Sequence, residues 1–536
     1  MPFWSRLFSP LVVCSAFAVA SFGQQSVDSN SGAAGGNAPQ AQPSLADMAR
    51  KMRKDKPAEV RMTDIDTKEL FKAVDKVFDF ASEDTGMPRH SSVKKALVGP
   101  ADIEKFTKDR LARAEYSQRF ARAELTMKKF GLLPRNFNLR EFLVKTSGQS
   151  IAGLYDEETK TVWLLNTISM EKQGPILAHE LTHALQDQNY DLRHWMKAAE
   201  KRSGAKSSDD DVSTDESTTA RHAIVEGQAM VVYLDFMLAL FGRNLKDSPG
   251  VVASMQDAAV QATIDTELMH KAPMVLREAG SFPYRAGLFF EADVLQKRGQ
   301  HAAFQGVFAQ PPRNTHEVFD SNAYLEHAKL TPVAIPDVTN VLSGNYEVFD
   351  AGSFGELDVR ALLKQFGDTH GATDFAPAWQ GGSYVAFRKA QLPAGADPKT
   401  SDVALLYVSR WKTAAAAEHF ARFYATSVAK RYNGALVQAV PACAVAPCPV
   451  GAALLTTEEG PVIVEQWPDN TVIVSESFDS ATEAKLSSAI RTAPVERHAE
   501  NIPQEELSMR LYALPAFREW QERIGEEMLQ GIATGR

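Results

Sequence analysis

The chain has 536 residues, of which 44% are hydrophobic and 23% charged, the composition of an ordinary globular protein. This length favours two or three domains over a single hydrophobic core. The formal net charge of −9 provides none of the clustered positive charge that nucleic-acid binding requires, so we exclude a nucleic-acid partner. Neither composition nor charge indicates an oligomeric state.

The N-terminus is typical of a secretory signal peptide. Arg6 precedes an apolar run over Leu11–Phe22, which is shorter than the ~20 residues that span a bilayer. We therefore expect a signal peptide over residues 1–23 and a secreted or periplasmic protein, with an uncleaved membrane anchor as the alternative. No other stretch is expected to cross a membrane.

Composition and periodicity divide the rest of the chain. Residues 24–44 are mostly Gln, Ser, Gly, Asn, Ala and Pro, with little to bury, and are predicted to be a disordered linker. Residues 45–335 are mainly helical in pattern, residues 336–500 indicate a separate α+β domain of unassigned role, and a helical tail over 501–536 closes the chain. The strands expected in the second domain include Ser383–Phe387, Ala404–Val408 and Val462–Gln466. The fold class is therefore α+β.

Within the first domain, Ile151–Tyr155 and Thr161–Leu165 are predicted to form a β-hairpin. A helix follows, and Gly174 and Pro175 mark its expected start, because proline at the first helical position loses no hydrogen bond.

Three more helices are expected, beginning near Ala220 and spanning Val251–Leu276 and Tyr284–Arg298. The stretch Ser203–Thr219, rich in Ser and Asp, is predicted to be a surface loop. Its aspartates lack the ligand spacing of an EF-hand, which favours a solvated loop over a calcium site.

The helix that begins near Gly174 and Pro175 carries His179-Glu180-Leu181-Thr182-His183. Side chains four residues apart lie on the same helix face, so His179 and His183 can hold one metal ion between them. Zinc with imidazole and carboxylate ligands and one open position lowers the pKa of its bound water to about 7. Glu180 is then placed to accept the proton of the attacking water and pass it to a leaving amine. The pattern predicts one zinc ion and a hydrolytic site.

A third ligand must come from elsewhere in the chain, because Gln186 and Asn189 stand where an extended motif would place other residues. Glu226 is the preferred candidate, since it lies in an apolar helical stretch where a carboxylate needs a partner. His222 and His194 remain alternatives, because zinc accepts His, Asp or Glu. Asp187 is the candidate for the carboxylate that accepts the second N–H of a zinc-bound imidazole.

The segment His179–Ala184, with Asp187 four residues after the second histidine, resembles the active-site helix of thermolysin-like zinc metallopeptidases, the gluzincins. The resemblance covers roughly residues 145–235 and implies a zincin-like catalytic domain over 45–335. It also implies Glu226 as third ligand, and a preceding strand, here Thr161–Leu165, along the peptide-binding edge. The wider layout resembles exported bacterial proteins with the same HELTH core.

The resemblance is incomplete. The family has an Asp four residues after its third ligand, and here that position is Met230. The family's transition-state donors, a Tyr and a His, have no motif to locate them, and Tyr284 and His316 are the candidates. These features together predict an exported zinc peptidase acting on a peptide or protein substrate. The alternative is a non-catalytic envelope binding protein built on a zincin-like scaffold.

After removal of the signal peptide, the remaining cysteines are Cys443 and Cys448. In an oxidising compartment, two cysteines five residues apart are predicted to form a small-loop disulfide, with free thiols as the alternative.

Overall fold

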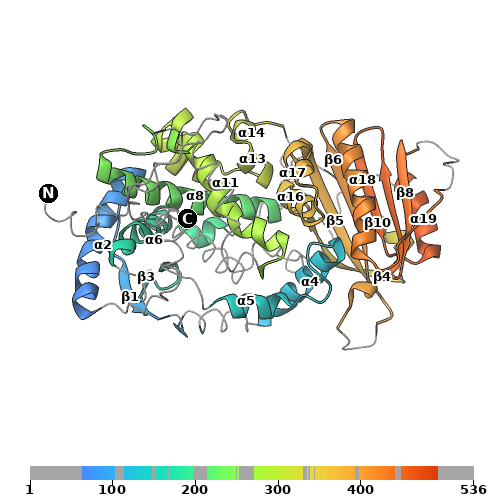
Figure 1. The fold of residues 1–536 in the computed structure, drawn as a ribbon, viewed down its shortest axis with the longest axis horizontal. Helices are drawn as coiled ribbons and strands as arrows, with labels where there is room; N and C mark the ends of the chain where they lie inside the picture. The colour runs from blue at the N-terminus through green and yellow to red at the C-terminus, as the bar shows by residue number, and fades with distance from the viewer. Residues whose placement is uncertain are drawn as a thin grey trace, which may run out of the picture.

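The computed structural model describes residues 63–492 with gaps, the longest at 197–213 and 253–270. The predicted signal peptide (1–23), linker (24–44) and C-terminal tail (501–536) lie outside the described residues. Helices and two sheets make up the described part, an α+β fold as predicted. Figure 1 shows a mainly helical half on the left and, on the right, a half built on the large sheet, drawn in orange and red.

Four long helices form the core of the helical half, and α8 packs against both α6 and α11. They are α2 (Asp64–Thr85), α6 (Met170–Tyr190), α8 (Thr214–Leu238) and α11 (Met274–Arg298). A small sheet with strand order β1-β3-β2 lies beside α6, and its strands are β1 (Lys94–Val98), β2 (Gly153–Asp156) and β3 (Thr161–Leu165). The predicted hairpin is confirmed, because β2 pairs antiparallel with β3. The parallel pairing of β1 with β3 was not anticipated.

The other half is built on an antiparallel sheet with strand order β4-β5-β6-β10-β9-β8-β7. Its strands are β4 (Tyr346–Ser353), β5 (Trp379–Lys389), β6 (Val403–Trp411), β7 (Leu436–Gln438), β8 (Gly451–Thr457), β9 (Gly460–Gln466) and β10 (Thr471–Glu476). All three strands predicted from the sequence lie within β5, β6 and β9. Side chains of β6 are buried on both faces of the sheet, which explains its nearly continuous apolar sequence.

Helices cover both faces of this sheet. On one face α4 (Ala114–Phe130) and α18 (Ala414–Arg431) contact the central strands. On the other, Leu486 of α19 (Ser480–Thr492) and Leu342 of α15 (Thr339–Leu342) join the apolar cluster formed by Leu406 and its neighbours. Shorter helices complete the described chain: α5 (Leu139–Ser147), α12 (Val307–Ala309), α13 (Thr315–Phe319), α14 (Ser321–Leu325), α16 (Glu356–Gln365) and α17 (Thr369–Asp374), with a π-helical turn η3 (Ala302–Gly306).

Tertiary packing overrides several local signals in the sequence. Helix α6 begins at Met170, so Pro175 lies inside it rather than at its first position. Helix α11 runs through Pro283, although separate helices were predicted on either side of this region. Both prolines lie on helices packed into the core, and this burial outweighs the backbone hydrogen bond that each proline removes.

Helix α8 begins at Thr214, six residues before its predicted start, and the loop predicted over Ser203–Thr219 is therefore wrong in its last part. Glu216 is buried there because its Oε2 accepts hydrogen bonds from the N–H (2.9 Å) and hydroxyl (2.8 Å) of Thr315. The region from Glu216 to Phe241 is also long and apolar enough to span a membrane, contrary to the sequence-based expectation, but most of it is buried inside the protein. We interpret α8 as the central core helix.

The two halves share one hydrophobic core. Helix α4, which precedes the predicted domain boundary at residue 335, places Phe130 against the rings of Phe354, Tyr384 and Tyr407. Its neighbour Lys129 is completely buried. The Lys129 ammonium donates to Glu459 Oε2 at 2.8 Å, to Ser477 Oγ at 2.7 Å and to the carbonyl of Thr400 at 3.2 Å. An ion pair thus joins α4 to the sheet.

We predict that Lys129→Met lowers the free energy of unfolding by about 3 kcal/mol, because the buried Glu459 carboxylate loses its buried counter-charge and keeps only Arg135, whose side chain is 33% exposed. The measurement is a urea-unfolding curve of the full chain. Lys72→Met is the control, since the Lys72 side chain is 70% exposed and its pair with Glu69 is worth little. Equal midpoints for the two variants would contradict the prediction.

A second buried polar pair links α2 to α8. The carboxyls of Asp84 and Asp235 share a hydrogen bond, and Asp235 Oδ1 also accepts the N–H of Leu245 at 2.5 Å. Burial, reinforced by the charge of Asp235, raises the pKa of Asp84 to about 8, and burial raises the pKa of Asp235 to about 7. The folded protein therefore holds a proton that unfolded carboxyls release above about pH 4.

This pair should make the protein less stable as the pH rises. Its stabilising contribution is complete below about pH 4, the unfolded pKa, and is lost as the pH rises through the raised folded pKa, near pH 8. In Asp84→Asn one titrating carboxyl is gone, so we expect its melting temperature to fall less than that of the wild type between pH 5 and pH 8. Asp79→Asn, on the exposed face of the same helix, serves as control. If the melting temperatures of Asp84→Asn and the wild type fall by the same amount between pH 5 and pH 8, the pair does not titrate as described.

Candidate metal centre

The structure brings together the three residues predicted as metal ligands. His179 and His183 lie one turn apart on α6, and Glu226 reaches them from α8. Glu226 Oε2 lies 3.3 Å from His179 Nε2 and 3.5 Å from His183 Nε2, and the two Nε2 atoms are 3.1 Å apart. All three potential ligand atoms lie within 4.8 Å of one another.

This donor set fits a zinc ion. Two imidazole nitrogens and one carboxylate oxygen are the ligands that catalytic zinc sites use, with a fourth position left open. His179 and Glu226 are buried, and Glu226 Oε2 faces two imidazole nitrogens without a hydrogen bond to any described residue. A cation between these atoms would satisfy lone pairs that otherwise point at one another.

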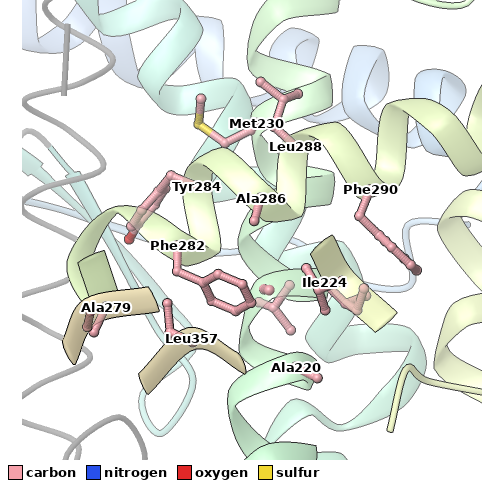
Figure 2. Close-up of a cluster of buried hydrophobic side chains, with 14 of the residues drawn as sticks. Ala220, Ile224, Met230, Ala279, Phe282, Tyr284, Ala286, Leu288, Phe290 and Leu357 are labelled. Carbon is pink, nitrogen blue, oxygen red and sulfur yellow. The ribbon is translucent and has the colours of Figure 1, made fainter. Parts of the chain in front are cut away.

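Close helix packing sets the position of Glu226. Gly227 of α8 lies against Gly287 of α11, and a Cβ added at Gly227 would lie 2.4 Å from the Gly287 carbonyl. The two helices can approach this closely only because both residues lack a side chain. Figure 2 shows apolar side chains from the same two helices, including Ala220 and Ile224 of α8 and Phe282 and Ala286 of α11. Tyr284 projects from the same stretch of α11.

His222 supports the third ligand from the same helix. It lies one turn before Glu226, and its Nε2 is 3.4 Å from Glu226 Oε1, the carboxylate oxygen that does not face the two motif histidines. His222 is therefore next to the ligand group but outside it. The other alternative, His194, is at the surface, where its 80% exposed side chain pairs with Asp191.

The two acidic residues of the site have opposite pKa shifts. Burial raises the pKa of Glu226, but the charge of His183 and the close polar contacts with the His179, His183 and His222 rings outweigh burial, so the pKa lies well below its ordinary value. Burial dominates for Glu180 and raises its pKa, although the neighbouring imidazoles oppose the shift. Glu226 is thus held as an anion suited to a cation, and Glu180 is suited to taking up a proton.

Glu180 faces strand β2 across a narrow gap. A Cβ at Gly153 would lie 3.0 Å from Glu180 Cγ, so glycine at this position leaves room for the carboxylate. A backbone hydrogen bond from Tyr155 also reaches Glu180 and lowers its pKa slightly against the effect of burial. The hairpin and the motif helix therefore form one unit around this carboxylate.

A cleft opens over the ligand group, with about 680 Å³ of empty space that includes the open solvent at its mouth. Besides the ligand group, Glu180, Gly153 and Tyr155, its lining includes Leu154, Glu157, Leu192, Met196, Val225 and Tyr284. The gluzincin resemblance implied that Thr161–Leu165 forms the peptide-binding edge of the cleft, and that prediction is wrong. Strand β3 is hydrogen-bonded on both sides, to β1 and β2, so β2 is the edge strand that borders the cleft.

Asp187 does not support an imidazole as predicted. Its Oδ2 accepts hydrogen bonds from the hydroxyl of Tyr155 at 2.7 Å and from the ammonium of Lys160 at 2.5 Å. His183 Nδ1 instead lies 2.9 Å from Gln186 Oε1, one residue nearer along the helix. Asp187 therefore ties the β2–β3 hairpin to α6 rather than orienting a ligand.

The surroundings of the second ring nitrogen of His179 also differ from the gluzincin pattern. Its Nδ1 is buried and has no hydrogen-bond partner among the described residues. The family's Asp is replaced by Met230, which offers no carboxylate. The ring of Tyr284 stacks near the His179 ring instead, with centroids 6.4 Å apart.

The two proposed transition-state donors have different outcomes. Tyr284 lines the cleft, as its prediction requires. His316 is not among the cleft residues. It lies on α13, which packs against α8, α11 and α16, and its ring pairs with Glu356 Oε2 of α16 at 2.5 Å and lies near Trp379.

The pair Cys443 and Cys448 is disulfide-bonded, as predicted. This bond lies in the sheet-containing half, between β7 and β8, and contributes nothing to the cleft described above.

We predict that Asp187→Asn reduces stability while leaving metal affinity nearly unchanged. Loss of the carboxylate weakens the hydrogen bonds that hold the hairpin, at a cost of about 1–3 kcal/mol. Melting temperature and zinc affinity, measured by chelator competition on the same samples, separate the two effects. A tenfold or larger loss of zinc affinity would instead place Asp187 in support of a ligand.

Comparison with known proteins adds one partial match. Residues 346–485 match a family model described as a domain of unknown function, DUF8575. The match covers the large antiparallel sheet, from β4 into α19, and lies inside the segment 336–500 that was predicted as a separate domain. It does not include the ligand group. No curated protein and no solved structure matches the chain.

Proposed function

We propose that this protein is an exported zinc-dependent peptidase. The observation that carries the proposal is the convergence of His179, His183 and Glu226 beside the carboxylate of Glu180, at the base of an open cleft. A zinc ion held by the three ligands would polarise a substrate carbonyl and acidify a bound water molecule. A binding protein would have no need for a general base at this position.

In this proposal Glu180 moves the proton. Its raised pKa favours uptake of a proton from the attacking water, and the same carboxyl then protonates the departing amine. The hydrogen bond from Tyr155 and the space left by Gly153 keep the carboxylate directed toward the ligand group. Tyr284 also lines the cleft, and in this proposal its hydroxyl stabilises the negative charge that develops on the substrate oxygen.

The cleft suits an extended peptide. The outer edge of β2 in the three-stranded sheet can pair with a substrate backbone, as exposed sheet edges do in other peptide-binding proteins. Leu154, Leu192 and Met196 would contact apolar substrate side chains. The disulfide in the other half of the molecule is consistent with an oxidising, extracytoplasmic compartment.

The decisive variant is Glu180→Gln. We expect purified wild-type protein to contain about one zinc ion per chain and to cleave an unstructured protein such as casein. The variant should retain the zinc and lose about 10²- to 10⁴-fold in rate, because only the proton acceptor is removed. Elemental analysis and a fluorescent-casein assay measure the two quantities.

Glu158→Gln is the matched control, since it makes the same chemical change at a neighbouring, 41% exposed glutamate that does not line the cleft. Its rate should stay near that of the wild type. Equal rates for Glu180→Gln and wild type would refute the peptidase mechanism. Zinc binding without cleavage of any unstructured protein would favour the alternative of a non-catalytic binding protein.

A further inference from the structure

A chain of buried amide side chains lies behind the second motif histidine. Gln186 Oε1 is 2.9 Å from His183 Nδ1. Gln186 Nε2 donates to the carbonyl of Val225 at 2.9 Å and to Gln228 Oε1 at 2.9 Å. Gln228 Nε2 in turn donates to the carbonyl of Ala303, in the π-helical turn η3, at 2.8 Å. Both glutamine side chains are completely buried.

The direction of each hydrogen bond in this series of amides is determined by the backbone carbonyls that accept from it. A backbone carbonyl can only accept, so Ala303 requires the Gln228 amide nitrogen to face it, and Gln228 Oε1 must then face Gln186. The carbonyl of Val225 and Gln228 Oε1 together take both N–H bonds of the Gln186 amide. Turning either amide over would bring oxygen against oxygen in a buried site, which is costly. Gln186 Oε1 therefore faces His183 as an acceptor.

An acceptor at that position determines which ring nitrogen of neutral His183 carries the proton. Nδ1 must donate to Gln186, so Nε2 keeps its lone pair and faces Glu226 and His179. This is the form of imidazole that binds a metal through Nε2. Carboxylates and backbone carbonyls usually accept this second N–H, and their loss commonly costs metal affinity.

We propose that Gln186 and Gln228 are positioning residues that hold His183 in its metal-binding form through a relay ending on the Ala303 carbonyl. The inference rests on the proposed zinc site. It assigns to two uncharged residues the task that Asp187 was expected to perform. The relay also crosses three elements, α6, α8 and η3, so it couples the orientation of one ligand to their packing.

Methionine substitutions test the relay, because methionine has nearly the volume of glutamine but cannot donate a hydrogen bond and accepts one only weakly. In Gln186→Met the acceptor for His183 is gone, and we expect zinc affinity to fall about 10- to 100-fold. In Gln228→Met the Gln186 amide keeps its bond to Val225, so the loss should be smaller but measurable. Affinities are measured on the full chain by competition with a zinc chelator.

Gln173→Met is the matched control. Gln173 is another fully buried glutamine on α6, and its amide donates to the carbonyl of Leu165 at 3.0 Å, away from the ligand group. The control should lose stability in the same way as the other variants while binding zinc as tightly as the wild type. The visible spectrum of cobalt-substituted protein, which reports ligand geometry, should change in Gln186→Met and not in Gln173→Met.

The outcomes separate this inference from the proposed function. If wild-type protein binds neither zinc nor cobalt, both fail. If the wild type binds zinc and the folded Gln186→Met and Gln228→Met variants bind it as tightly as Gln173→Met, the relay is refuted while the zinc site stands. If Gln186→Met does not fold, the comparison of Gln228→Met with Gln173→Met decides alone. Weaker zinc binding by Gln228→Met than by Gln173→Met supports the relay, and equal zinc binding by the two variants overturns it.

Discussion

The organisation of the helical half depends on one buried carboxylate. Glu226 lies in the middle of the core helix α8, among three imidazoles and almost out of contact with water. A carboxylate there is tolerated only if positive or hydrogen-bonding groups surround it. The need to meet this requirement explains why α6 crosses α8 at the level of His179 and His183, and why His222 faces the remaining oxygen. The cleft, the general-base candidate and the hairpin are all arranged around that crossing.

The sequence was most informative where the signal was local. A spacing of four residues places two histidines on one helix face whatever the rest of the fold does. Two short apolar segments, 151–155 and 161–165, with a polar turn between them were sufficient for a hairpin. Glu226 was identified across a long sequence distance because an acid in an apolar helical stretch is itself anomalous. Gln186 and Gln228 gave no comparable signal, since a buried glutamine looks like any polar helix residue until its neighbours are known.

The errors share a physical cause, which is that partners distant in sequence decided the outcome. Asp187 has the spacing of a residue that supports His183, but the hairpin supplies Tyr155 and Lys160 as stronger partners. The gluzincin resemblance placed Thr161–Leu165 at the cleft edge, but β1, which was not foreseen, pairs in parallel with β3 and makes it an interior strand. Residues 214–219 have the composition of a loop, yet Thr315 gives Glu216 the hydrogen bonds that allow its burial. None of these partners can be read from a local pattern.

The contact between Gly227 and Gly287 has a consequence for how the cleft can vary. A Cβ at Gly287 would lie 2.1 Å from the carbonyl oxygen of Ala223, so α8 and α11 touch backbone to backbone directly beside the third ligand. Tyr284 is carried one helical turn away on α11, and its distance from the ligand group is therefore dictated by main-chain contact rather than by adjustable side chains. Diversity in what this cleft accepts must then arise on the opposite wall, from β2 and from the residues that follow α6, while the α8–α11 wall acts as an invariant template.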